Sequence, residues 1–472
     1  MATSLNILEQ SQVAPPPGSL PSTTLPLTFF DIPFFHSPLI KRIFFYDFPR
    51  PTHHFLQTAL PILKHSLSLA LQHFFPFAAN LLLPPHPLLS HIRYLPGDSL
   101  SFTVAESAAD FALLTSHSPQ HIGNYHPLLP TLPPSRVEND GTRVFPLMAI
   151  QVTVLPYSGF AISLTYNHLA ADGNSLHHFV KFWASLCKTR GDVARASLEA
   201  TFSLPSHERE RVKDPNGLKL LYFQAFGIRD SKSIEFGRHV PDVFTNNIVR
   251  STLVLSREQV DKLKKWVSLN CVTNDSGALH ISSFVVTCSL TWVCMVRSEE
   301  NEGNGDAVNS DDLCCLVFLA DSRDRPEFSL PSTYFGNCVA SCLVAMKRSE
   351  IVGENGVVEV ANAIGRQIMD FKSNALRNAE MLVSEYGEIT KRGKSRVIIA
   401  GSPKLAVYET DFGWGKPKKS EAAHIEQSTS ISLSDSRDQK GGIDVALALE
   451  TIRMNEFTNI FQEQLNNMID KF

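Results

Sequence analysis

The stretch MAIQVTVLPYSGFAISLTYNHLAADGNSLHHFVKFWASLCK, residues 148–188, carries the clearest structural pattern in the chain. Residues 148–156 and 159–167 are apolar or alternating runs of strand length, and the Tyr-Ser-Gly between them predicts a hairpin. Residues 176–188 place their large apolar side chains at helical spacing. This stretch therefore predicts two paired strands, a turn that contains a histidine, and a helix.

Segments of strand type and helix type alternate along the rest of the chain. A helix is expected at residues 55–75, with Pro61 near its first turn. Further helices are expected at 257–269 and 282–298, and further strands at 100–106, 248–256, 313–321, 395–401, 429–438 and 443–450. Because strands and helices interleave in both halves, the fold class is predicted to be α/β.

The length of 472 residues predicts two domains. We expect one domain at 1–200 and another at 248–472. Residues 201–247 are polar, have few periodic apolar positions, and are interpreted as a crossover between the domains. Residues 298–312 are acidic and rich in Gly and Asn, which predicts a surface loop.

Composition excludes several classes of protein. With 43% hydrophobic and 19% charged residues, the chain is not predominantly disordered. Its 43 Lys and Arg against 47 Asp and Glu give a net charge of −4, so nucleic acid is not an expected partner. Of the 29 prolines, 21 lie in residues 1–150, which restricts long helices there to the gaps between prolines.

The eight cysteines form no Cys-x-x-Cys pair, and five lie in apolar runs, so we expect reduced, buried thiols. The beginning of the sequence lacks a basic segment followed by an apolar one, and the apolar stretch at 281–296 is too short to span a bilayer. These features predict a soluble, cytoplasmic protein without membrane insertion. We also expect a monomer.

His168-Leu-Ala-Ala-Asp172-Gly173 follows the second strand of the hairpin. A histidine at such a turn can present its imidazole in a cavity, where a base of near-neutral pKa can accept a hydroxyl proton. Asp172 can cap the following helix or orient the turn. The spacing alone is a weak signal, because about one chance match is expected in a chain with 17 histidines. A structural histidine therefore stays open on this motif alone.

Two further motifs lie in the second half of the chain. Arg323, which follows Asp321 at the end of a predicted strand, is either a surface residue or a fixed cation whose partner is a buried carboxylate such as Asp172. Asp411-Phe-Gly-Trp-Gly415 favours a tight structural turn with an aromatic anchor. A protein kinase is rejected, because its catalytic loop and its glycine-rich loop are both missing from the sequence.

Other signals of chemistry are missing from the sequence. There is no Gly-x-Ser-x-Gly elbow of a serine hydrolase, no Walker loop and no dinucleotide-binding fingerprint. His177 and His178 lie in the predicted helix and are better interpreted as packing residues than as metal ligands. Cys338 and Cys342 lack the nearby ligands that zinc requires, so no metal is expected.

The motifs in their order along the chain are more specific than any one of them. With Tyr334-Phe-Gly-Asn-Cys338, LPLTFFD at 25–31, AGSPKL at 400–405 and IRMNEF at 452–457, the whole chain resembles the plant BAHD family of CoA-dependent acyltransferases. Tyr-Phe-Gly-Asn-Cys is typical of the clade that acylates anthocyanins, flavonoid glucosides and other phenolic glucosides. Within this clade, the chain resembles the phenolic glucoside malonyltransferases.

The resemblance implies two domains of the chloramphenicol acetyltransferase type, joined by a long crossover, with an active-site channel between them. It implies that His168 is the general base and that Asp172 forms a salt bridge with Arg323. Residues expected to support the site are Gly173, Asp411, Gly413, Trp414 and Gly415. Residues expected near CoA or the acyl group are Lys181, Ser282, Ser283, Ser402, Pro403 and Lys404.

No permanently bound cofactor is implied; acyl-CoA is a co-substrate. The acyl group is expected to pass directly to a sugar hydroxyl, the 6-hydroxyl by analogy with the family, in a ternary complex. A backbone N–H or the indole of Trp414 is a candidate oxyanion donor. The acceptor stays open among anthocyanin, flavonol and simple phenolic glucosides.

Malonyl-CoA is the preferred donor in this interpretation. A malonyl carboxylate requires a cation, and Lys181 occupies the helix position where relatives that use malonyl-CoA often have an arginine. Relatives that use p-coumaroyl-CoA also carry lysine there, so a hydroxycinnamoyltransferase is the alternative. A non-catalytic binding protein of the same fold is a remote alternative, and acylation of a free alcohol or amine is disfavoured by Tyr-Phe-Gly-Asn-Cys.

Overall fold

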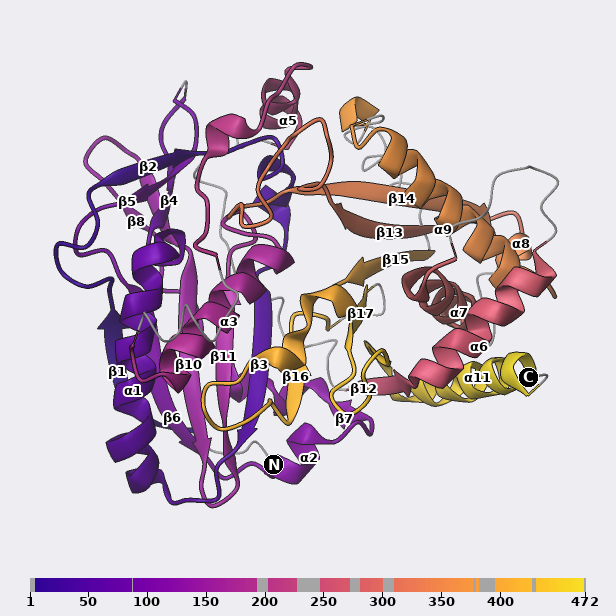
Figure 1. The fold of residues 1–472 in the computed structure, drawn as a ribbon, viewed down its shortest axis with the longest axis horizontal. Coiled ribbons are helices and arrows are strands. Elements are labelled where there is room, and N and C mark those ends of the chain that lie inside the picture. Colours follow the sequence, from indigo (N-terminus) through magenta and orange to yellow (C-terminus); the bar gives the residue numbers. More distant parts are fainter. Residues whose placement is uncertain are drawn as a thin grey trace.

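The structure is a computed structural model, and it describes residues 5–86, 88–192, 203–226, 247–271, 281–299, 310–376, 379–381, 395–426 and 430–470. The described residues form two large mixed sheets and a smaller antiparallel sheet (Figure 1). Helices pack against the large sheets, as predicted for the α/β class.

The first large sheet belongs mainly to the N-terminal half. Its strand order is β1 (Leu5–Val13), β6 (Leu100–Ser107), β10 (Met148–Leu155), β11 (Gly159–Tyr166), β3 (Ile40–Asp47) and β16 (Lys419–Glu421). The predicted hairpin is confirmed, since β10 and β11 pair antiparallel from Met148 opposite Tyr166 to Leu155 opposite Gly159. All the residues of these two strands are buried, which explains their nearly continuous apolar sequence.

Helices α1 (Thr52–His73) and α3 (Gly173–Lys188) pack on each other over this sheet (Figure 1). The Trp183 indole N–H of α3 donates to the carbonyl of Leu63 in α1 at 3.1 Å. The predicted position of Pro61 in the first turn is wrong, because α1 begins at Thr52 and Pro61 lies in its interior. The carbonyl four residues earlier belongs to Gln57, which is exposed and can bond to water instead.

The second large sheet belongs mainly to the C-terminal half. Its strand order is β14 (Val339–Lys347), β13 (Leu313–Asp321), β15 (Ser395–Ala400), β17 (Ser430–Asp435), β18 (Ile443–Glu450), β12 (Ile248–Leu255) and β7 (Gln120–His121). Its helices, at the right of Figure 1, are α6 (Arg257–Asn270), α7 (Ser283–Arg297), α8 (Arg348–Val352), α9 (Gly356–Ser373) and α11 (Thr451–Ile469). Helix α7 is buried along most of its length, which agrees with the predicted buried helix.

The two halves exchange strands. The short β7 from the N-terminal half pairs with β12 at the edge of the second sheet, and β16 from the C-terminal half pairs with β3 at the edge of the first. Two buried ion pairs lie near this exchange. In both of them the anion is Glu421 of β16, which binds Arg250 of β12 and Lys419 of its own strand. The exchange holds the two sheets beside each other, and the space between them contains the site described below.

The remaining elements complete the N-terminal half. The smaller sheet has the order β2 (Thr23–Pro26), β5 (His91–Tyr94), β4 (Asn80–Leu83), β9 (Arg143–Pro146) and β8 (Arg136–Val137), and helix α2 spans Phe111–Thr115. Of the predicted crossover, residues 203–226 and 247 are described, and they include helix α5 (Leu218–Phe226), which contacts the short helix Ile32–His36. Most of the predicted surface loop at 298–312 lies outside the described residues. The predicted domain boundaries stay a prediction.

Candidate active site

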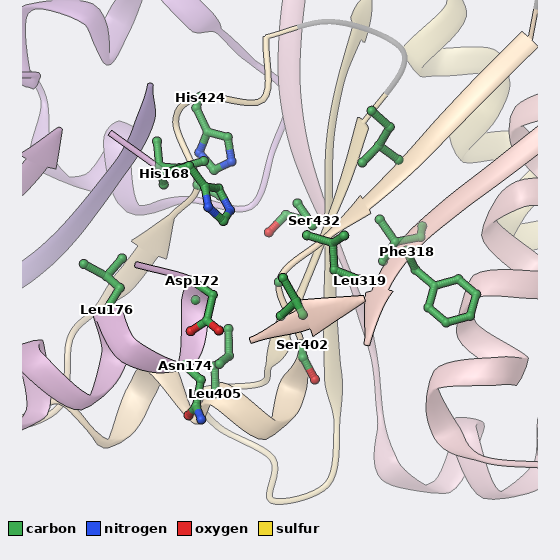
Figure 2. A pocket seen from close by; sticks show the side chains of 18 of the residues that line it. His168, Asp172, Asn174, Leu176, Phe318, Leu319, Ser402, Leu405, His424 and Ser432 are labelled. Carbon is green, nitrogen blue, oxygen red and sulfur yellow. The ribbon is translucent and has the colours of Figure 1, made fainter. Parts of the chain in front are cut away.

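A cavity of about 2090 Å³ lies at the junction of the two large sheets. Figure 2 shows His168, Asp172 and His424 on one side of it, with Phe318, Leu319 and Ser432 opposite. Binding sites for a single small molecule usually measure about 300–1,000 Å³. The cavity is therefore large enough to hold two small-molecule substrates at once.

His168 leaves the end of β11 and directs its ring into this cavity (Figure 2). The ring stacks on Phe34, with centroids 3.8 Å apart and planes 4° apart. Its Nδ1 lies 3.1 Å from the side-chain oxygen of Asn337, and its Nε2 has no hydrogen bond to any residue in the described ranges. One ring nitrogen is thus fixed, and the other is available to a substrate.

Asn337 determines which nitrogen of His168 carries the proton. Its amide nitrogen donates to Asp31 at 2.9 Å and to the backbone carbonyl of His168 at 2.9 Å, so its oxygen must face the ring. This oxygen accepts the Nδ1–H of His168, which leaves the lone pair on Nε2. Asp31 is itself held by a buried ion pair with Arg209 at 2.6 Å.

The surroundings of His168 keep it in the neutral form. Burial lowers its pKa from the ordinary value of 6.5, although Asp172, the hydrogen bond to Asn337 and the charge of Asp31 act in the opposite direction. A neutral imidazole whose Nε2 is free can accept a proton from a hydroxyl group.

Asp172 points away from the imidazole of His168 and into the protein (Figure 2). Its carboxylate forms the predicted ion pair with Arg323, at 2.9 Å, and accepts the backbone N–H of Ser175 at the start of α3 and that of Cys338. Burial by itself raises the pKa of Asp172, but the charge and hydrogen bonds of Arg323 outweigh it and hold the pKa below its usual value. The carboxylate thus fixes the turn between His168 and α3.

Arg323 has every side-chain nitrogen engaged. Besides Asp172, its guanidinium binds Asp321 at 3.0 Å and donates to the backbone carbonyls of Tyr334 and Gly336. The Tyr-Phe-Gly-Asn-Cys segment therefore contributes carbonyls to Arg323 and the amide of Asn337 to His168. Gly173, the first residue of α3, lines the cavity, and a Cβ there would lie 3.4 Å from Leu405.

Asp411-Phe-Gly-Trp-Gly415 forms the predicted structural turn. The Asp411 carboxylate accepts the backbone N–H groups of Gly413 and Gly415 and pairs with Lys188 of α3 at 2.9 Å. Both glycines have positive φ angles, 105° and 86°, which favour glycine.

The side chain of Trp414 packs edge-on to Phe160, with ring centroids 5.3 Å apart. Trp414 does not belong to the residues that line the cavity in the described part of the chain. Its packing on Phe160 places its indole against the sheet, so the structure gives no support to Trp414 as an oxyanion donor.

The residues predicted near CoA separate into two groups. Five of them line the cavity: Ser282, Ser283, Ser402, Pro403 and Lys404. Lys181 instead lines a smaller neighbouring pocket, and its Nζ lies 3.8 Å from Glu409. The role of Lys181 in recognising the acyl group stays a prediction.

Within the described ranges, no cluster of His, Cys, Asp and Glu could hold a metal ion. The eight cysteines are free thiols, and seven of them are buried. His177 and His178 bind the backbone carbonyls of Gly173 and Ser203, in agreement with packing roles. No helix among these residues is both long and apolar enough to span a bilayer.

Two mixed sheets thus enclose a large cavity, and a neutral histidine directs its ring into it from one side. The crystal structure of vinorine synthase has this fold, with a TM-score of 0.68 and 19% identity over 96% of each chain. The sequence matches the Transferase family over residues 5–464. The chain belongs to this family, the BAHD acyltransferases, as the sequence analysis predicted.

Plant relatives extend over nearly the whole chain. Coumaroyl-CoA:anthocyanidin 3-O-glucoside-6''-O-coumaroyltransferase 1 of Arabidopsis thaliana is 39% identical over 97% of both chains. Malonyl-coenzyme A:anthocyanin 3-O-glucoside-6''-O-malonyltransferase of Dahlia pinnata is 35% identical over 98% of both chains. Both names specify an acyl-CoA as the donor, and the protein is accordingly an acyltransferase.

Four residues of the site were not predicted from the sequence. Asp31, Phe34 and Asn337 position His168, and Arg42 lines the same cavity. Asp31 and Asn337 lie within the motifs LPLTFFD and Tyr-Phe-Gly-Asn-Cys, so their positions were known but their contacts were not. Phe34 and Arg42 lie in apolar or mixed stretches that have no distinguishing pattern.

Proposed function

We propose that the protein transfers an acyl group, malonyl in preference, from acyl-CoA to a sugar hydroxyl of a phenolic, flavonoid or anthocyanin glucoside. The observation that carries this proposal is the orientation of His168, whose Nε2 is unprotonated and faces the cavity. The names of the relatives supply the substrate classes, because both relatives act on anthocyanin or anthocyanidin glucosides.

The proposed reaction requires a base, His168, that lies beside both the acyl-CoA and the glucoside. Nε2 of His168 takes the proton of the sugar hydroxyl while the hydroxyl oxygen attacks the thioester carbonyl carbon. The resulting tetrahedral oxyanion collapses, the carbon–sulfur bond breaks, and the imidazolium returns its proton to the departing CoA thiolate. The products are the sugar ester and free CoA, and no covalent enzyme intermediate is needed.

In this mechanism Asp172 and Asn337 are positioning residues. Asp172 fixes the turn through Arg323, and Asn337 holds Nδ1–H so that the lone pair stays on Nε2. Binding both substrates together turns an encounter of two molecules into a reaction within one oriented complex. The large volume of the cavity supports such a ternary complex.

Cations at the cavity surface favour a donor that carries phosphates. Lys372, Arg396 and Lys404 line the cavity and are exposed or half-buried, and no ion pair occupies them within the described residues. Solvent-facing cations of this kind suit the phosphate groups of CoA. The neighbouring segments Ser282–Ser283 and Ser402–Pro403 are proposed to line the same end of the donor.

A second candidate donor is p-coumaroyl-CoA. The observation that favours it is the 39% identity to a coumaroyltransferase, against 35% for the malonyltransferase. This difference is small. Recognition of the two acyl groups requires opposite chemistry, a cation for malonyl and an apolar surface for coumaroyl.

A donor competition tests the proposed function. The purified protein receives equal concentrations of malonyl-CoA and p-coumaroyl-CoA with a panel of anthocyanin, flavonol and simple phenolic glucosides, and mass spectrometry identifies the products. We expect malonylated glucosides. Coumaroylated products would establish the second candidate, and an absence of product with every donor and acceptor would contradict the proposed substrates.

A further inference from the structure

Arg42 is a buried arginine whose donors are largely unused. It lies on β3, is 6% exposed, and lines the same cavity as His168. Its one side-chain hydrogen bond is long, from Nη1 to the hydroxyl of Ser420 at 3.4 Å, and its buried Nε has no hydrogen-bond partner in the described part of the chain. Buried polar groups are nearly always satisfied, so an unsatisfied guanidinium requires an explanation.

The charge of Arg42 is also poorly compensated. No carboxylate of the described residues comes within 4.0 Å of its guanidinium. Glu421 is the acidic residue that acts on it most, but this carboxylate is already bound by Arg250 and Lys419. Arg250 and Lys419 thus share the single carboxylate of Glu421, and Arg42 adds a third positive charge that acts on these residues. Burial lowers the pKa of Arg42, and Tyr166 and Glu421 oppose this only in part.

Arg42 and His168 both act on a third side chain of the cavity, the imidazole of His424. The imidazole of His424 has its pKa lowered to about 3, by burial first and then by the nearby charges of Arg42, Arg250 and His168. Figure 2 shows His424 beside His168 in the cavity. The Nδ1 of His424 donates to the carbonyl of Lys41, the residue before Arg42. One short segment of β3 therefore connects the cation to the neighbourhood of His168.

We propose that Arg42 binds the terminal carboxylate of the malonyl group of the donor. This inference rests on the proposed function and deepens it, because it names the residue that selects malonyl. The carboxylate would supply the missing counter-charge, and a guanidinium can bind it with two parallel hydrogen bonds. A p-coumaroyl group ends in a neutral phenol and would leave the charge of Arg42 uncompensated.

The phosphates of CoA are a second source of anionic charge, and the burial of Arg42 argues against them. The cations proposed for the phosphates are Lys372, Arg396 and Lys404, which are at least partly exposed, whereas Arg42 is buried. Malonyl-CoA and acetyl-CoA carry identical phosphates and differ in the carboxylate. A comparison of these two donors therefore separates the two sources.

The test is the substitution Arg42→Met, which keeps an unbranched side chain and removes the charge. We expect kcat/KM for malonyl-CoA to fall about 30-fold or more, as when one partner of a buried charge pair is removed. With acetyl-CoA as donor, kcat/KM should change by no more than about threefold, because the uncharged acetyl group makes no contact with Arg42. An equal loss with both donors would assign Arg42 to CoA binding or to structure, and no loss with malonyl-CoA would overturn the inference.

Arg396→Met and Lys181→Met are the matched variants. Arg396 also lines the cavity without an ion pair in the described residues, so its loss should affect both donors equally. Lys181 pairs with Glu409 outside the cavity lining, and its variant should keep the preference for malonyl-CoA. Loss of this preference in Lys181→Met, and not in Arg42→Met, would return the role to Lys181.

Ligand binding provides a measurement that does not depend on turnover. In thermal unfolding, malonyl-CoA should stabilise the unsubstituted protein more than acetyl-CoA does, and this difference should disappear in Arg42→Met. An equal shift with both ligands in the unsubstituted protein would contradict a carboxylate site. If the protein forms only coumaroylated products, the inference fails while the acyl transfer by His168 stands.

Discussion

Arg323 and Arg42 line the same cavity and are about equally buried, at 5% and 6% exposure, but their surroundings are opposite. Arg323 binds two carboxylates and two backbone carbonyls, so its charge and its donors are used within the protein. Among the residues that the structure describes, Arg42 has a single long hydrogen bond, to Ser420. An arginine whose hydrogen bonds and counter-charge come from the protein maintains the shape of the site. An arginine that lacks them can bind a ligand.

His168 resembles Arg323 because contacts within the protein hold its side chain, although His168 is the group that reacts. Its Nδ1 and its ring face are held by Asn337 and Phe34, and Nε2, which no described residue binds, is left for the substrate. The site thus combines a rigid base with one nitrogen available to the substrate and, on the side of β3, a cation with several donors that no described residue accepts. Such rigidity is what preorganised catalysis requires.

The largest expected effect comes from removing the base. His168→Ala should lower kcat about 10²- to 10⁴-fold, the usual contribution of a general base. The melting temperature should change little, because the side chain faces a cavity and contributes one hydrogen bond to the protein. Steady-state kinetics with the preferred donor measures this, and near-normal turnover would contradict the role of His168.

The next largest effect concerns the stability of the folded protein, which depends on the counter-charge of Arg323. Asp172→Ala leaves Arg323 buried without its main counter-charge and should lower the free energy of unfolding by about 3–5 kcal/mol. Asp321→Ala is the matched control, because Asp321 binds the same guanidinium from a half-exposed position and should cost no more than about 1 kcal/mol. Denaturant unfolding measures both variants.

Arg42→Met completes this comparison. Because the charge that it removes is buried and poorly compensated, we expect the substrate-free protein to keep its stability or to gain some. A loss as large as that of Asp172→Ala would show that Arg42 is structural, and the contrast between the two arginines would be broken.

The residues whose partners lie within the protein were predicted from the sequence better than the residues that are left for a ligand. The pairing of Asp172 with Arg323 was implied by the resemblance to the family, and Asp172 was already a candidate partner for a cation at the end of a strand. The hairpin and α3 were also found, because their apolar periods are long and unbroken. Their boundaries differ from the prediction by only a few residues, as is usual where helix ends are set by caps such as Asp172.

Contacts between distant segments could not be predicted from the sequence. Asn337 meets His168 across 169 positions, and the exchange of β7 and β16 between the sheets depends on two strands of only two and three residues. Arg42 stands between Lys41 and Ile43 in a strand, and neither residue indicates that its side chain reaches a cavity. When the partner of an arginine is a ligand, the sequence contains no second residue of the pair. A sequence pattern therefore cannot indicate the role of that arginine.

The smallest expected effect is a shift in pH dependence, and it tests how firmly His168 is held. The acid limb of kcat/KM against pH reports the pKa of the base in the free enzyme. Burial lowers this pKa from 6.5, so the active neutral form persists to a lower pH than it would for a histidine in water. We expect kcat/KM to be constant near neutral pH and to fall only below pH 6.5. An acid limb above that value would contradict a desolvated base.

Asn337→Ala sharpens this measurement. The hydrogen bond of Asn337 raises the pKa of His168 against the effect of burial, so its removal should move the acid limb to still lower pH. The same variant frees the imidazole to place its proton on Nε2, which should reduce kcat even at neutral pH while KM changes little. A shift in the limb together with a lower kcat is the signature of a positioning residue. A lower melting temperature with an unchanged pH profile would instead mean that Asn337 only connects Asp31 to the turn.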